Sequence, residues 1–272
     1  MQQVQVHTSD NTSLFQSFYI KLKSRNPILF WFGCIFFISG ITCALLTQLN
    51  SENIVLGINA WIKPMKFYFS IGIASWTFTW LLVYVQKQRA VKIFSIVTVI
   101  TMLFEMFVIT WQAANGRLSH FNISTPLYGI LFSLMGIAIT IFTLWAFYIN
   151  VLLFKQKEFP VWMSDGYKWG IRWGLLLFVI FAFEGGLMAA KLTHLVGMDM
   201  SASKGLPILN WSTMAGDLRV AHFFGMHSLQ LLPLCGFYFA RTKFQIHLLS
   251  FFYFLFVSLL FWQALQGFPL IN

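Results

Sequence analysis

The chain has 272 residues, of which 58% are hydrophobic and only 10% are charged. Soluble domains carry about 25% charged residues, so this composition excludes an ordinary soluble protein and predicts one embedded in a membrane. The formal net charge is +10, but the basic residues form short clusters between apolar runs, which argues against nucleic-acid binding. We therefore expect a multi-pass protein of the cell membrane, whose partner is the lipid bilayer.

Residues 1–26 precede the first apolar run and are expected to form a cytoplasmic N-terminal segment. Within it, Phe15, Phe18, Tyr19 and Leu22 share one helical face, with Lys21 and other bases off that face. This spacing predicts a short amphipathic helix that lies on the membrane surface.

Seven apolar runs reach the length of about 20 residues that a membrane-spanning helix needs. They lie at 27–48, 65–86, 91–113, 125–154, 169–190, 219–240 and 245–266. Most connections are short, so sequential helices should be antiparallel neighbours. The sequence thus predicts an all-α, polytopic membrane protein whose seven transmembrane helices form a single domain over 27–272.

The distribution of basic residues predicts the orientation of these helices. Twelve Lys and Arg residues fall on the side of the N-terminus, and six fall on the other side. Because cytoplasmic loops carry the excess of positive charge, the N-terminus is expected in the cytoplasm and the C-terminus outside.

Three predicted helices carry an ionisable group in their outer half. These groups are Glu105, Glu184 and His227, and two glycines that permit close approach follow Glu184. At the helical rise of 1.5 Å per residue, all three lie about 10 to 12 Å below the outer boundary. Polar groups at that depth are costly unless they face a protein interior, so we assign these three as candidate catalytic residues.

Further polar residues lie nearer the outer boundary, where a long loop at about 191–218 is typical of a lid or binding element. The basic ones are expected to neutralise an acidic substrate group or the bundle's own carboxylates, and snorkelling to the interface is the alternative. The candidate substrate-binding residues are Lys63, Lys66, Gln112, Arg117, Arg219 and Gln230.

Imidazole and carboxylate groups at one depth also suggest a metal centre, because zinc and iron accept nitrogen and oxygen donors. The two histidines of the sixth predicted helix are five residues apart, about 140° around its axis, so both reach one ion only if that helix is distorted. The candidate ligands are His222, His227, His120, Glu105 and Glu184.

Polar groups concentrate in the outer half of the predicted bundle, and the inner half has few ionisable groups. This asymmetry favours a membrane-embedded enzyme that uses a divalent metal, zinc or iron, on a lipid or other amphiphilic substrate. A proton- or cation-coupled transporter is one alternative, although the sequence shows no inverted repeat. A haem-binding or ligand-sensing membrane protein, with His222 or His227 as an axial haem ligand, is the other.

Overall fold

The computed structural model describes residues 14–271, and its helices are the long elements that the apolar runs predict. The helices are α1 (Leu14–Arg25), α2 (Pro27–Leu49), α3 (Ile62–Leu81), α4 (Gln88–Ala114), α5 (Pro126–Lys155), α6 (Asp165–Lys191), α7 (Leu218–Tyr238) and α8 (Lys243–Leu265). A 3-10 turn, η1 (Leu82–Tyr84), follows α3. Two short antiparallel strand pairs are formed by β1 (Ile54–Val55) with β2 (Ile58–Asn59) and by β3 (Leu195–Val196) with β4 (Gly216–Asp217).

Six helices of the described chain are long and apolar enough to cross a membrane: α2, α3 with η1, α4, α5, α6 and α8. Large apolar side chains on their outer surfaces, such as Ile38, Phe107 and Ile137, are exposed. A soluble protein buries most such residues, so this surface fits a hydrocarbon environment and the chain is a multi-pass membrane protein. The sixth predicted span, α7, has 21 residues but is not among the six apolar helices.

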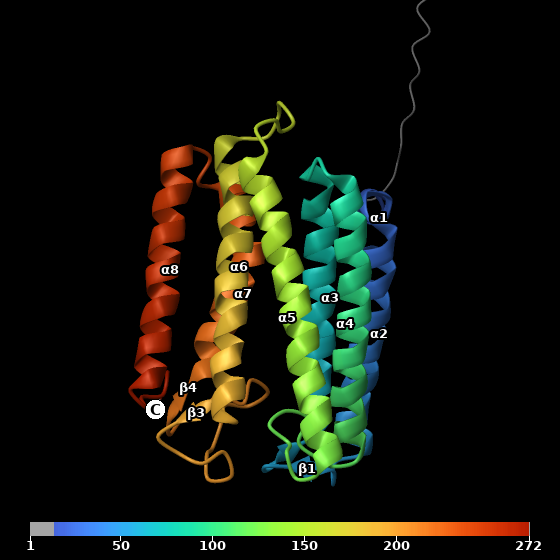
Figure 1. The fold of residues 1–272 in the computed structure, drawn as a ribbon, viewed down its shortest axis with the longest axis vertical. Helices are drawn as coiled ribbons and strands as arrows, with labels where there is room; N and C mark the ends of the chain where they lie inside the picture. Colours follow the sequence, from blue (N-terminus) through green and yellow to red (C-terminus); the bar gives the residue numbers. More distant parts are fainter. Residues whose placement is uncertain (1–13, 272) are drawn as a thin grey trace, which may run out of the picture.

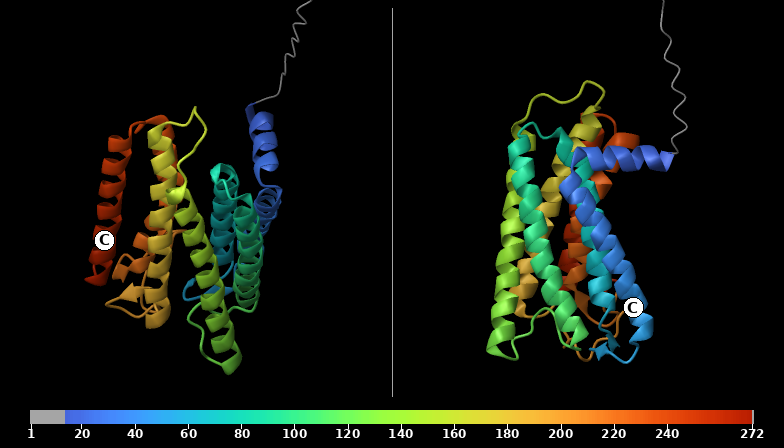
Figure 2. Two further views of the ribbon diagram at one scale, coloured as in Figure 1. Left: turned by 45° about the horizontal axis from the view of Figure 1, so that its top comes forward. Right: turned by 90° about the vertical axis from the view of Figure 1, so that its right-hand side faces the viewer.

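The seven helices from α2 to α8 lie side by side, and their connections alternate between two ends of the bundle (Figure 1). One end carries both strand pairs, the 115–125 turn and the C-terminus; we call it the strand end, which is the end expected outside the cell. The helix α1 lies across the opposite end (Figure 2). There, Arg25 donates a hydrogen bond to the Trp80 carbonyl at 2.8 Å and Phe18 stacks on the Trp80 ring. The side chain of Phe15 lies outside the described residues.

Close backbone contact holds α7 against α6. A Cβ atom added to Gly170 would lie 2.5 Å from the Leu232 carbonyl oxygen, and one added to Gly174 would lie 2.7 Å from that of Ser228. The Ser228 hydroxyl also donates a hydrogen bond to the Gly174 carbonyl at 2.9 Å. Small residues permit this approach, which compensates for the modest hydrophobicity of α7.

Four phenylalanine rings fill the centre of the bundle between α3, α4, α5 and α6. The rings of Phe78, Phe94, Phe142 and Phe178 are buried, with centroids 5.0 to 6.2 Å apart. We call this group the aromatic plug. Phe78 and Phe94 lie toward the opposite end of α3 and α4, so this apolar packing occupies the core away from the strand end.

Candidate functional site

Six ionisable residues from α3, α4, α7 and two loops converge at the strand end. Lys63 is the member whose charge acts on each of the other five. We call the group the Lys63 cluster. Its members are Lys63, Lys66, Glu105, His120, His194 and Arg219.

The first turn of α3 places both lysines of the cluster at the strand end. Pro64 lies in this turn, where its missing N–H removes no helical hydrogen bond. The Lys66 ammonium group donates a hydrogen bond to the Leu209 carbonyl at 3.0 Å. Lys63 as a residue is half-buried, and its ammonium group has no hydrogen-bond or ion-pair partner among residues 14–271. An ammonium group without an acceptor is therefore available to a ligand.

An ion pair at the start of α7 fixes the third cation of the cluster. Asp217 is fully buried, caps α7 by accepting from the Arg219 backbone N–H, and accepts from the Ser212 backbone N–H at 2.9 Å. The Arg219 guanidinium contacts both carboxylate oxygens, with Nη2 at 2.6 Å and Nε at 2.9 Å, and also donates to the Asn210 carbonyl. This pair neutralises Arg219 and fastens the long loop to α7.

Two acceptors on α4 face the core without a donor. Glu105 is 7% exposed and Gln112 is 2% exposed, and the side-chain Oε1 atom of each accepts no hydrogen bond from the described residues. They are seven residues apart and so share one face of the helix. Buried polar atoms in native structures nearly always have a partner, so these two atoms mark a place where a ligand or water completes the site.

Two neutral imidazoles in the strand-end loops border the cluster. Burial lowers the pKa of His120 well below its usual value near 6.5, and the charge of Lys63 lowers it further. Burial, with the charge of Arg219, lowers the pKa of His194 to about 3. The ring of Phe121 packs near both, with its centroid 6.1 Å from that of His120 and 6.4 Å from that of His194. The sequence did not mark His194 as a site residue, because only its place in the long loop distinguished it.

A second buried carboxylate lies away from the cluster, between α6 and α7. The Glu184 side chain is 6% exposed, and neither of its oxygens accepts a hydrogen bond within the described chain. The Nδ1 atom of His222 lies 3.9 Å from Glu184 and donates to the Phe181 carbonyl at 2.8 Å. Beside it, Gly185 has no Cβ where the His222 ring approaches. No interaction among residues 14–271 joins Glu184 to Glu105.

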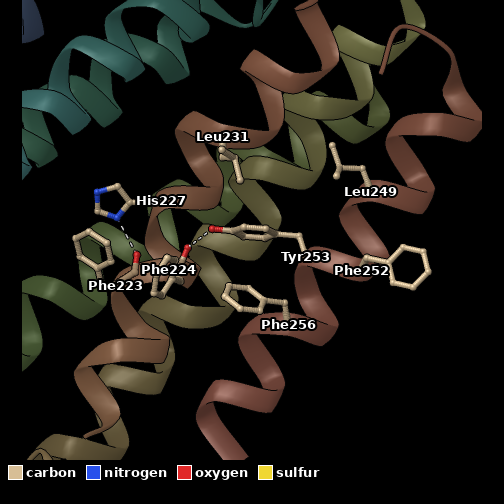
Figure 3. A pocket seen from close by; sticks show the side chains of 8 residues that line it. All are labelled: Phe223, Phe224, His227, Leu231, Leu249, Phe252, Tyr253 and Phe256. Carbon is tan, nitrogen blue, oxygen red and sulfur yellow. Dashed lines mark hydrogen bonds between the residues drawn. The ribbon is translucent and has the colours of Figure 1, made fainter. Parts of the chain in front are cut away.

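The remaining predicted site residues occupy other positions. His227 lies on the outside of α7, where its ring packs on Phe223 at a centroid distance of 4.1 Å and its Nδ1 atom donates to the Phe223 carbonyl at 2.8 Å (Figure 3). Gln230 donates to the Thr77 hydroxyl at 3.2 Å and thereby joins α7 to α3. The Arg117 guanidinium lies 5.2 Å from the centre of the Tyr128 ring.

The expected metal centre is not supported by the geometry. Residues 14–271 contain no group of three or more His, Cys, Asp or Glu side chains arranged to hold a metal ion. The five expected ligands are instead divided: Glu105 and His120 belong to the Lys63 cluster, Glu184 faces His222, and His227 points outward. Distortion of α7 does not bring its histidines together, because Gly225 packs against the Phe181 side chain within a continuous helix.

Comparison of the chain with protein-family models, curated proteins and solved structures gives no match. We therefore infer its function from the chemistry of the residues themselves.

Proposed function

We propose that this protein is a membrane-embedded enzyme that acts, from the strand end, on an amphiphilic substrate with an anionic head group. The observation that carries this proposal is Lys63, a half-buried lysine whose charge acts on five other ionisable groups and whose ammonium group has no acceptor in the described chain. Asp217 neutralises Arg219, whereas neither lysine of the cluster forms an ion pair with any residue of the described range 14–271. An anionic group supplies the missing acceptor through charge-assisted hydrogen bonds.

Within this proposal, the lysines bind the head group and Glu105 transfers protons. A general acid or base must reach the reacting group directly or through one water molecule. The Glu105 carboxyl group is the candidate for this role, because its Oε1 atom has no partner in the described chain and the charge of Lys63 acts on it. His120, a neutral imidazole on which the charge of Lys63 acts, is the second proton-transfer candidate.

The aromatic plug favours an enzyme served from one end over a transporter. Hydroxyl groups near the plug, such as those of Ser75, Thr79 and Thr98, donate to backbone carbonyls of their own helices. They are therefore not free to line a polar path between the two ends.

The topology that we propose has seven spans, with α7 as the sixth and with the strand end outside the cell membrane. At 1.5 Å per residue, the 21 residues of α7 extend over about 30 Å, the thickness of the hydrocarbon core. Cysteines introduced at Ser124 and Lys204 in a cysteine-free background should react with an impermeant reagent from outside, and one at Lys157 should not. If only the Lys157→Cys variant reacted, the strand end would face the cytoplasm and the proposed orientation would be wrong.

The binding proposal is tested with purified protein and three 12-carbon probes: dodecyl phosphate, dodecanoate and neutral dodecanol. At least one anionic probe should raise the melting temperature of the wild type, and dodecanol should not. The Lys63→Met variant should lose this response, Lys63→Arg should retain part of it, and Lys204→Met, at an exposed lysine outside the cluster, should behave as the wild type. An equal response of the wild type and Lys63→Met would refute the assignment of Lys63.

A further inference from the structure

A groove of about 440 Å³ runs between α7 and α8 on the surface of the bundle (Figure 3). Its wall consists of five aromatic rings, two leucines and His227. Binding sites for small molecules commonly occupy about 300–1,000 Å³, so the groove is large enough for a ligand. Phe252 and Leu231 are 56% and 41% exposed, so the groove is open on the side that faces hydrocarbon.

The two polar side chains of the wall, Tyr253 and His227, both donate hydrogen bonds to backbone carbonyls of the protein. The Tyr253 hydroxyl donates to the Phe224 carbonyl at 2.6 Å, and the His227 Nδ1 atom donates to the Phe223 carbonyl (Figure 3). An occupant therefore meets aromatic and aliphatic surface and no free donor. The chemistry that fits such a wall is a hydrocarbon chain rather than a polar molecule.

Three consecutive loop residues connect the strand end of the groove to the Lys63 cluster. The Trp211 ring packs on Phe223 and Phe224, with centroid distances of 5.3 and 6.1 Å. The preceding residue, Asn210, accepts a hydrogen bond from Arg219, and Leu209 before it accepts one from Lys66. Arg219 and Phe223 are also one helical turn apart, so the cationic and aromatic surfaces adjoin.

We infer that the groove between α7 and α8 holds the hydrocarbon chain of an amphiphile whose anionic head group binds the Lys63 cluster. This inference rests on the proposed function and specifies its substrate class as a long-chain carboxylate or a long-chain phosphate. The open side of the groove lets the chain enter from the bilayer, while the head group stays at the strand end. The substrate therefore reaches the site without leaving the membrane.

The test compares ligands that share a head group but differ in chain length. Dodecyl phosphate should bind the wild type about tenfold more tightly than butyl phosphate, because a few buried methylene groups suffice for such a difference. Dodecanoate and butyrate provide the same comparison for a carboxylate head. Affinities are measured with the full chain in lipid nanodiscs by native mass spectrometry.

Two variants fill the groove, and one serves as a matched control. Leu231→Trp and Leu249→Trp, one on each wall, should remove the chain-length effect and leave butyl phosphate binding unchanged. Leu234→Trp lies on the exposed surface of α7 outside the groove and should retain the effect. Equal affinities of the wild type for both chain lengths would overturn the inference while leaving the anion site intact.

A photoactivatable dodecyl phosphate, with its reactive group in mid-chain, locates the chain directly. Cross-links should concentrate on 223–231 and 249–256 and should weaken in Lys63→Met. Cross-links spread evenly over the exposed faces of α2, α5 and α8 would show only annular lipid and would overturn the inference. Cross-links in the groove that persist unchanged in Lys63→Met would instead refute the head-group site.

Discussion

Replacement of Asp217 by Asn tests whether the buried ion pair fastens the long loop to the bundle. The Asp217 carboxylate accepts from two backbone N–H groups and pairs with both Nε and Nη2 of Arg219. Asn is nearly the same size, but it has no charge and offers one oxygen instead of two. The variant should therefore keep the shape of the cap and leave the Arg219 guanidinium without its counter-ion.

The magnitude follows from the burial of the two partners. Loss of one member of a buried ion pair destabilises a protein by about 3–5 kcal/mol. The Arg219 side chain is 28% exposed and keeps part of its hydration, so we expect a loss near the lower limit, about 3 kcal/mol. For a chain of this size, about 2 °C per kcal/mol gives a decrease in melting temperature of about 6 °C.

The assay is thermal unfolding of the purified protein in detergent, with a double-mutant cycle as its control. Arg219→Met alone leaves the Asp217 carboxylate buried and without a cation, and should also destabilise the protein. Because the two residues contact each other, the double variant should lose less stability than the sum of the single variants. A decrease below 2 °C for Asp217→Asn, or strictly additive effects, would refute the structural role of the pair.

Three further predictions concern the loops and the helix contacts. The folded-state pKa values of His120 and His194 lie below the ordinary value of 6.5, so below about pH 6.5 the unfolded chain binds more protons than the folded one and the stability should fall. In a variant with both histidines replaced by Gln, the melting temperature should therefore decrease less between pH 7 and pH 5 than in the wild type. Equal decreases in the two proteins would contradict the buried, neutral state of these histidines. Gly174→Leu should destabilise the protein by several °C, measured in the same assay, because its Cβ meets a backbone oxygen of α7 at 2.7 Å; an unchanged melting temperature would show that α6 and α7 are packed less closely. Glu184→Gln should leave the Lys63-dependent response to dodecyl phosphate intact, because Glu184 faces His222 rather than the cluster; loss of that response would join the two carboxylates in one site.

The sequence predicts the helices well because hydrophobic length is a local property. The first apolar run, 27–48, corresponds closely to α2, and the predicted span 91–113 lies within α4. The two ends of the bundle follow from the same runs, since short connections force neighbouring helices to alternate. Only α7 departs from this agreement: the helix forms where the run predicts it, but it is not among the six helices apolar enough to span a membrane. Its run carries several polar residues, which contact α6, α3 and the long loop.

The composition of the candidate site was harder to predict, since depth along a helix does not give direction around it. The sequence predicts a common depth for Glu105, Glu184 and His227, but the rotation of each helix turns them toward Lys63, His222 and the outer surface, respectively. That rotation depends on contacts such as the glycines of α6, whose partners are distant in sequence. His194 had no periodic signal at all, because a loop has no regular face.

The close packing of α6 and α7 has a consequence for biogenesis. A segment that carries Arg219, His222, His227 and Gln230 partitions poorly into a bilayer when it leaves the translocon alone. The glycine surface of α6 offers it an immediate partner, so α6 and α7 should integrate together as a helical hairpin. On the proposed seven-span topology, enlarging several of those glycines together would weaken this joint integration: in part of the chains α7 would stay out of the bilayer, α8 would insert in the reverse direction, and the C-terminus would appear on the opposite side of the membrane.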